Sequence, residues 1–175
     1  MSLTLNRFLA LAAFSVCLAV SSPGEASDVE ASEKTLDLTN VINTCYALGG
    51  DVTNKKAFEE GIYLSKGKPD HALVALKGII FEGEKPISSF RMNDQIDITV
   101  FRGSFLKLSK VEIKKVLLKD SNIEIYAEYK DFPDCDIASQ PAAVIPIGQL
   151  PPDKYSVSLF VGDKLRNKAE FSVHK

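Results

Sequence analysis

The feature that most constrains this chain is a repeated alternation of apolar and polar residues from residue 95 onward. In "QIDITVF", Ile96, Ile98 and Val100 alternate with Asp97 and Thr99. The same alternation returns in "KVEIKKVLL", "IEIYAEYK", "YSVSLFV" and "AEFSV". A period of two is the signature of half-buried antiparallel strands. Because turn-forming stretches such as "KDSN" and "QLPPD" separate these runs, the pattern predicts a mainly β chain folded as an antiparallel sandwich.

The first 26 residues have the layout of a secretory signal peptide. Arg7 precedes an apolar run from Phe8 to Val20, and small residues follow, so that cleavage fits after Ser21 or after Ala26. The run is shorter than the roughly 20 residues that span a bilayer. We therefore expect a secreted or periplasmic protein with no membrane span after signal removal, and an uncleaved anchor is the alternative. Residues 27–34, "SDVEASEK", are expected to be a disordered lead-in.

Residues 35–94 are less regular, and we expect them to form a short, part-helical extension that packs on the sandwich. "LDLTNVINTCYALGG" has apolar residues at helical spacing and ends in two glycines, which predicts a helix, although its β-branched residues also fit a strand. "HALVALKGIIFEG" predicts one or two buried strands, and "EKPISSFRMND" predicts a linker or an edge strand. Further on, Pro146 in "AAVIPIG" predicts an edge strand or a bulge.

The charge distribution argues against nucleic-acid binding. The formal net charge is −2 at pH 7, and the sequence has neither a basic patch nor a long run of like charge. Nucleic-acid binding depends on clustered basic residues. We expect the partner to be another protein of the cell envelope or extracellular space. Glycine-rich phosphate loops and zinc-ligand spacings are missing from the sequence, so no cofactor is expected.

Few residues offer catalytic or metal-binding chemistry. A Ser-His-Asp arrangement would rest on His71, because His174 is the penultimate residue. The neighbours of His71, "KPDHAL", lack a GxSxG nucleophile elbow, which favours an exposed loop histidine. Asp131, Asp134 and Asp136 are ligands of the kind that calcium binds, but they lack the glycine and distal glutamate of an EF-hand. We therefore expect a polar turn there, no metal, and no enzyme.

In "VIPIGQLPPDKYSVSLFVGDKLRNKAEFSV", an expected apolar strand meets an "LPP" loop, a tyrosine starts the next expected strand, and a glycine hairpin precedes the last one. Over residues 95–173 the chain thereby resembles a bacterial exported Ig-like or fibronectin-type sandwich domain. Asp153 stands where such loops usually have glycine. The resemblance implies an Ig-like domain at 95–175 and a corner role for Tyr155, whose hydroxyl would bond to the upstream loop.

Two aromatic residues fall on the outer faces of the predicted strands. Tyr126 and Phe160 both alternate with residues assigned to the core. Outward aromatic side chains mark an interface in some proteins. They also fit a face that is covered by a second layer made from residues 35–92, which is the interpretation we favour.

The function indicated by these features is a non-catalytic binding or assembly module outside the cytoplasm. A protease-inhibitor-like loop binder is one alternative, using the loops "PDCDIASQP" and "FRGSFLKLS". A metal-dependent or hydrolytic enzyme that uses the aspartate cluster is another. The sandwich resemblance favours an architecture without choosing among these, because such folds host many unrelated functions.

We predict a disulfide between Cys45 and Cys135, the two cysteines left after signal removal. It would close a loop of about 90 residues, which stabilises a fold by roughly 4 to 5 kcal/mol in the chain-entropy model. The non-reduced chain should therefore be two hydrogens lighter than the dithiol in an intact mass spectrum, and reduction should lower the melting temperature. Two thiols that react with an alkylating reagent after unfolding would support the alternative of two unpaired, partly buried cysteines.

Overall fold

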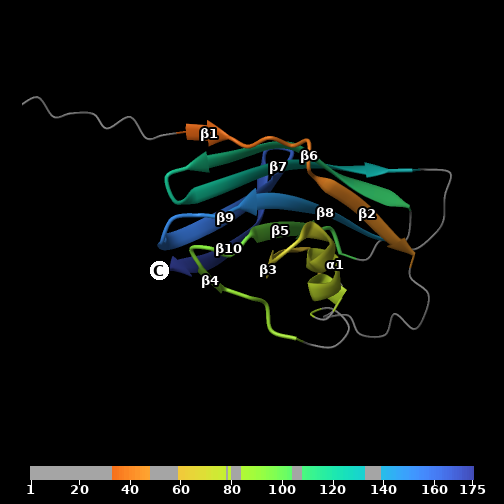
Figure 1. Ribbon diagram of the computed structural model, residues 1–175. Coiled ribbons are helices and arrows are strands. Elements are labelled where there is room, and N and C mark those ends of the chain that lie inside the picture. Colours follow the sequence, from red (N-terminus) through yellow and green to blue (C-terminus); the bar gives the residue numbers. More distant parts are fainter. Residues whose placement is uncertain (1–32, 48–58, 78, 80–83, 104–107, 133–138) are drawn as a thin grey trace, which may run out of the picture. The chain divides into compact units, whose positions relative to one another are not determined.

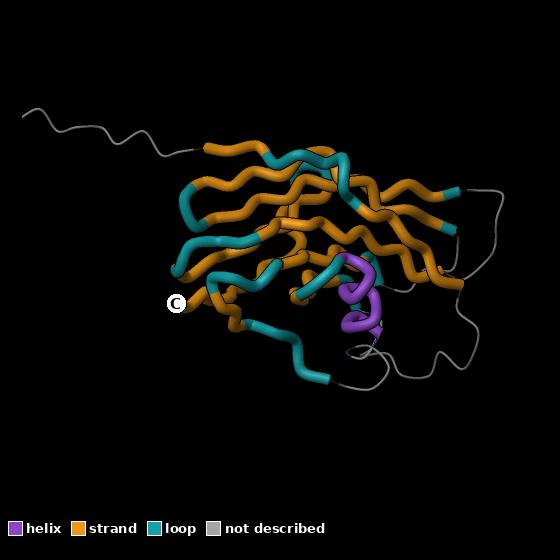
Figure 2. Tube along the Cα trace, in the orientation of Figure 1, coloured by secondary structure: helices purple, strands orange, loops and turns teal. Residues whose placement is uncertain are grey.

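Two β-sheets and one helix make up the part of the chain that the computed structural model describes, residues 33–47, 59–77, 79, 84–103, 108–132 and 139–175 (Figures 1 and 2). Sheet A has the strand order β1-β6-β7-β9-β10-β4, and sheet B has the order β2-β8-β5-β3. The bounds are β1 Glu33–Thr35, β2 Ile42–Ala47, β3 Gly61–Lys66, α1 Pro69–Lys77, β4 Ser89–Arg91, β5 Ile96–Phe101, β6 Ser109–Lys119, β7 Asn122–Asp131, β8 Ser139–Gly148, β9 Asp153–Val161 and β10 Lys164–His174.

The predicted leader, residues 1–26, lies outside the described residues, and so does most of the predicted lead-in. Glu33 and Lys34, which end that lead-in, are the first two residues of strand β1. No helix in the described ranges is long and apolar enough to cross a membrane. Export and signal cleavage therefore stay predictions.

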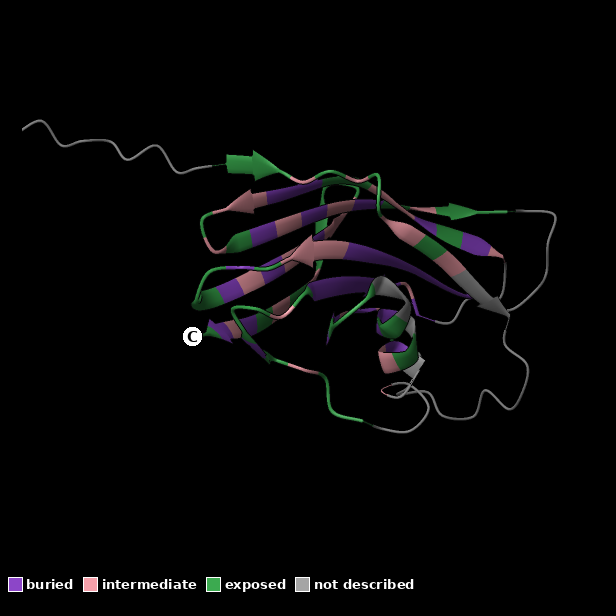
Figure 3. Ribbon diagram, in the orientation of Figure 1, coloured by how far each residue is buried: buried purple, intermediate pink, exposed green. Residues whose placement is uncertain are grey.

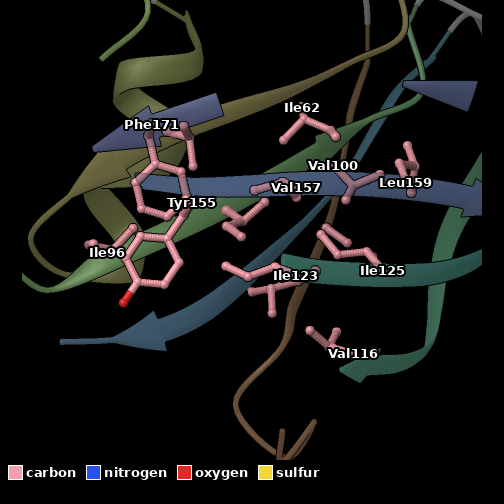
Figure 4. Close-up of a cluster of buried hydrophobic side chains, with 14 of the residues drawn as sticks. Ile62, Ile96, Val100, Val116, Ile123, Ile125, Tyr155, Val157, Leu159 and Phe171 are labelled. Atoms are coloured by element: carbon pink, nitrogen blue, oxygen red, sulfur yellow. The ribbon is translucent and has the colours of Figure 1, made fainter. Parts of the chain in front are cut away.

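The predicted alternation is present in the strands after residue 108. In β7, Ile123 and Ile125 are buried whereas the intervening Glu124 is partly exposed, and β9 repeats the pattern with Val157 and Leu159 (Figure 3). The buried side chains of sheet A meet those of sheet B in one apolar core (Figure 4). Burial of these two facing sides supplies the hydrophobic stabilisation of the sandwich, and the prediction of a mainly β, two-sheet fold is confirmed.

Strand β6 departs from the predicted alternation because it contains a bulge. The register with β7 shifts between Ile113 and Lys115, so side chains beyond that point face the side opposite to the one that strict alternation predicts. Val116 then points into the core. Leu117 pairs with Glu124 on the opposite side of the sheet, where it is still only 3% exposed.

Strand β5 is buried on both sides, although its sequence predicts one polar, exposed side. Asp97 is 2% exposed and Thr99 is 1% exposed. The reason is helix α1, which packs on the outer side of sheet B against β3, β5 and β8. Leu76 of α1 forms a small apolar cluster there with Phe101 and Ala142.

The prediction of buried strands in "HALVALKGIIFEG" is wrong for the described part, because residues 69–77 form α1. Ala72 and Leu76, four residues apart on the helix, are buried, whereas Val74 is 68% exposed. Alanine and leucine are strong helix formers, and Pro69 occupies a favourable first position. A run of consecutive apolar residues does not by itself separate a buried strand from a helix.

The predicted helix in "LDLTNVINTCYALGG" is also wrong, because strand β2 occupies residues 42–47. A turn precedes the strand, where the Asp37 carboxylate accepts a hydrogen bond from the Thr39 backbone N–H at 2.9 Å. Strand β2 pairs with β8 from Ile42 opposite Val144 to Ala47 opposite Ser139. Pairing with a distant strand thus overrides the helical spacing, as is common for β-branched sequences.

The N-terminal segment is part of the sandwich and not a separate extension packed on it. Strands β2 and β3 belong to sheet B, while β1 and β4 form the two edges of sheet A. The compact unit accordingly runs from Ala31 to Lys175. The edge-strand alternative for "EKPISSFRMND" is confirmed, because β4 pairs only with β10.

Two neighbouring strand pairs in sheet A are parallel, which corrects the expectation of a wholly antiparallel sandwich. Strand β7 runs parallel to β9, and β10 runs parallel to β4. Strand β8 crosses to sheet B between β7 and β9, so the chain returns in the same direction. At Pro146 the register of β8 with β5 shifts, which confirms the predicted bulge, although β8 itself lies inside sheet B.

Tyr155 lies at the corner that the "LPPDKY" stretch predicts. Its hydroxyl donates to the Pro151 carbonyl at 2.9 Å, and the residue is 5% exposed. The ring stacks on Phe171 with centroids 5.2 Å apart, and the Phe171 ring in turn lies nearly perpendicular to the Phe90 ring (Figure 4 labels Tyr155 and Phe171). The corner therefore joins the loop before β9 to the core of the sandwich.

Tyr155→Phe should lower the free energy of unfolding by about 1 to 2 kcal/mol, because it leaves the Pro151 carbonyl without this donor while keeping the ring. The matched change Tyr126→Phe removes a hydroxyl that bonds to Glu124 on the partly exposed outer side, where water can replace the bond, and should cost less than about 0.5 kcal/mol. Urea denaturation followed by circular dichroism measures both. Equal losses for the two variants would contradict the assigned corner.

Candidate functional site

Four side chains form a row across the outer side of sheet A, which we name the aromatic row: Lys115, Tyr126, Phe160 and Leu165. The strand registers place Lys115 of β6 opposite Tyr126 of β7, Tyr126 opposite Phe160 of β9, and Phe160 opposite Leu165 of β10. Directly opposed residues of neighbouring strands lie on the same side of a sheet. The structure thus brings together the two aromatic residues that the sequence predicts to face outward.

The row presents apolar surface to solvent. The rings of Tyr126 and Phe160 stack with centroids 5.1 Å apart and planes 13° from parallel. Both residues are partly exposed, and Leu165 is 47% exposed. Stacked aromatic rings lose little conformational entropy when a partner covers them, because they are already held in place.

Ion-paired side chains border the aromatic row on one side along β6 and β7. Lys114 lies 3.1 Å from Glu112 and 3.0 Å from Glu128, and Lys130 also pairs with Glu112. Hydrogen bonds from Lys130 and Lys114 lower the pKa of Glu112 to about 2. These carboxylates and ammonium groups therefore neutralise one another at neutral pH.

A second group of paired charges borders the row on its other side. Lys119 lies 3.4 Å from Glu33 and 3.5 Å from Glu124, and the Tyr126 hydroxyl donates to the Glu124 carboxylate at 2.8 Å. That hydrogen bond raises the pKa of Tyr126 above its ordinary value, because it stabilises the protonated hydroxyl. Glu124 thus connects the aromatic row to its polar border.

The described part of residues 35–92 does not form the covering layer that we favoured over Tyr126 and Phe160. Its strands lie within the two sheets, and α1 contacts the strands of sheet B. Within the described ranges, the outer side of sheet A therefore stays open, and this favours the interface interpretation.

The predicted loop and aspartate candidates are only partly placed. Asp131 pairs with Arg102, whose guanidinium also donates to the Ser109 hydroxyl and lies 4.7 Å from the centre of the Tyr129 ring. Asp134, Asp136 and most of the loop "PDCDIASQP" lie outside the described residues. No cluster of metal-binding side chains occurs in the part of the chain that the structure describes.

The cysteine pair is not tested by the described residues. Cys45 belongs to β2, where its backbone lies opposite Pro141 of β8. Cys135 lies outside the described residues. The disulfide therefore stays a prediction.

The two histidines belong to different elements. His71 is an exposed residue of α1, and the Nε2 atom of His174, in β10, lies 3.0 Å from the Ser172 hydroxyl. The expectation of a loop position for His71 is wrong, because it lies in the first turn of a helix.

Sequence reasoning missed a group of buried polar side chains below α1. Ser65 and Asp97 lie opposite each other on β3 and β5, and Thr99 follows on the same side of β5. The Ser65 hydroxyl, one Asp97 carboxylate oxygen and the Thr99 hydroxyl have no hydrogen-bond partner among the described residues. Burial raises the pKa of Asp97 to about 6, and the charge of His71 acts in the opposite direction. In the sequence these residues were visible only as the polar positions of an alternating strand, and no local pattern indicated that α1 would cover them.

Comparison with protein families, with curated proteins and with solved structures finds no match to this chain. The Ig-like resemblance is therefore untested by relatives, and the mainly β, two-sheet fold stands on the structure alone.

Replacing Asp97 by Asn should stabilise the fold at neutral pH. Because the folded-state pKa is about 6 against an ordinary 3.8, the folded chain holds this proton more tightly than the unfolded chain. The wild type should therefore lose stability as the pH rises from about 4 to about 6, relative to Asp97→Asn, with a difference of about 3 kcal/mol at pH 7.

Urea titrations at several pH values measure this difference. Asp163→Asn, in the exposed turn between β9 and β10, is the matched control, because it makes the same substitution at an exposed position. If Asp97→Asn and Asp163→Asn had the same profile, Asp97 would not be the buried acid that the structure indicates.

Proposed function

We propose that this protein is an exported, non-catalytic binding or assembly module that binds another protein through the aromatic row of sheet A. The observation that carries the proposal is the alignment of Tyr126, Phe160 and Leu165 across three neighbouring strands. Export rests on the leader pattern of residues 1–26.

The composition of this surface supports a protein partner. Interfaces between proteins commonly have an apolar centre enriched in aromatic residues and a polar rim. Here Tyr126, Phe160 and Leu165 form the centre, and the ion-paired glutamates and lysines of β6 and β7 form the rim. Because these charges are already paired within the chain, a partner need not supply a counter-charge for them.

The geometry of the row favours binding over catalysis. Its members offer ring faces, a branched alkyl group and a lysine stem, which contribute packing area. The Tyr126 hydroxyl is engaged by Glu124, and its pKa is raised, so it is a poor nucleophile at neutral pH. A rigid sheet then serves as the platform, since side chains on paired strands hold fixed positions.

The test is capture of partners on the purified protein and on Phe160→Glu, which places a carboxylate in the centre of the row. A genuine partner should be enriched on the wild type and lost from Phe160→Glu. With the partner purified, Phe160→Glu should raise the dissociation constant at least tenfold, because the buried charge is left unpaired. Isothermal titration calorimetry measures this constant.

Ser172→Glu is the matched control. It adds the same charge to the same side of sheet A, at the far end of β10 from the row. This variant should bind within about twofold of the wild type if the row is the binding centre. Partners that bind Phe160→Glu and the wild type equally would contradict the proposal.

A further inference from the structure

Strand β2 is an edge strand of sheet B, and among the described strands it pairs on one side only. It pairs with β8 in an unbroken register from Ile42 to Ala47, and no other described strand pairs with it. An open edge presents unpaired backbone N–H and C=O groups to any extended chain that approaches it.

β2 also lacks the features that usually protect an edge. Its sequence "INTCYA" has no charged residue and no proline, and its register has no bulge. Sheet A ends instead in two strands of three residues each, β1 and β4. At the other edge of sheet B, Glu60, which directly precedes β3, bonds to β10. Arg166 donates to the Glu60 carboxylate at 3.0 Å and the Asn167 amide donates to the Glu60 carbonyl at 3.4 Å.

Two hollows flank β2 and are lined in part by its own residues. One, of about 510 Å³, is lined by Val41, Ile42 and Pro146 together with Thr39 and Asn40. The other, of about 250 Å³, joins β2 to the start of β6 and the end of β7, and is lined by Asn43, Thr44, Leu108, Ser109, Lys110 and Phe132. The hollows adjoin successive residues of β2, Ile42 in one and Asn43 with Thr44 in the other, so side chains of a single added strand would reach both.

Lys110 makes an acidic side chain favourable in any chain that binds along this edge. Among the described residues that line the two hollows, it is the charged side chain. Lys114, Lys119 and Lys130 are held in ion pairs, whereas Lys110 has no ion pair with any residue in the described ranges. Phe132, in the same hollow, is 46% exposed. An occupant with apolar side chains and a carboxylate complements this arrangement.

We propose that β2 binds an extended peptide segment of a partner protein by strand addition, with apolar side chains in the two hollows and an acidic side chain beside Lys110. The backbone of β2 supplies the hydrogen bonds, and the hollows supply the sequence preference. The strand that would bind the peptide, β2, is the edge of sheet B, whereas the aromatic row crosses the middle strands of sheet A. The second hollow also reaches sheet A through Lys110 of β6.

The test begins with a phage-displayed library of random peptides selected on the full chain. Selected peptides should alternate apolar residues and carry a glutamate or aspartate, and bound peptide should slow amide hydrogen exchange in residues 42–47. Asn43→Lys and Lys110→Glu should each raise the dissociation constant of a synthetic selected peptide at least tenfold. Fluorescence anisotropy measures this constant, and both positions are exposed, so circular dichroism should show intact folding.

Two control variants separate this site from other surfaces. Lys168→Glu, an equal charge reversal on β10, and Phe160→Glu, in the aromatic row, should leave peptide affinity unchanged. A library that yields no binder, or peptides that bind Asn43→Lys as tightly as the wild type, would overturn the proposal. A dimer in light scattering that Asn43→Lys abolishes would also overturn it, because a second copy of the chain would then occupy the edge.

Discussion

The burial of strand β5 from both sides is the constraint on which the rest of the structure depends. Its inner side chains, Ile96, Ile98 and Val100, are fully buried in the core between the two sheets. Its outer side chains lie below α1, which brings Asp97 and Thr99 out of contact with water. A helix on one side and a six-stranded sheet on the other therefore exclude water from β5, and within the described ranges this leaves the outer side of sheet A as the exposed sheet face.

Polar groups are paired on the outer side of sheet A, whereas below α1 several of them lack partners among the described residues. On the outer side of sheet A, glutamates and lysines are paired with one another, and Glu124 also accepts the Tyr126 hydroxyl. Below α1, an aspartate with a raised pKa lies beside hydroxyls that lack partners among the described residues. Buried, unpaired polar groups cost stability, whereas exposed paired charges cost little. The outer side of sheet A thus suits reversible contact with a partner. The polar groups below α1 instead reduce the stability gained by packing the helix on sheet B.

The candidate surfaces arise from how the strands are joined. Strand β8 crosses to sheet B, so β9 returns parallel to β7 and places Phe160 beside Tyr126. The same crossing gives β8 an inner position in sheet B and leaves β2 at the edge. One connection therefore creates both the aromatic row and the open strand edge, although the two lie on different sheets.

The sequence by itself determined that the chain forms many strands and that Tyr126 and Phe160 face outward. Both follow from local alternation, which adjacent residues carry. The corner position of Tyr155 was implied by the resemblance to Ig-like sandwich loops, and its hydroxyl does bond to the Pro151 carbonyl. The sequence misassigned β2 and α1, because a short apolar run fits either a helix or a strand until a distant partner selects one. Only the tertiary structure decided that β7 and β9 are parallel, that α1 covers Asp97, and that Lys110 lies beside β2. These features depend on contacts between residues far apart along the chain, and no local pattern encodes such contacts.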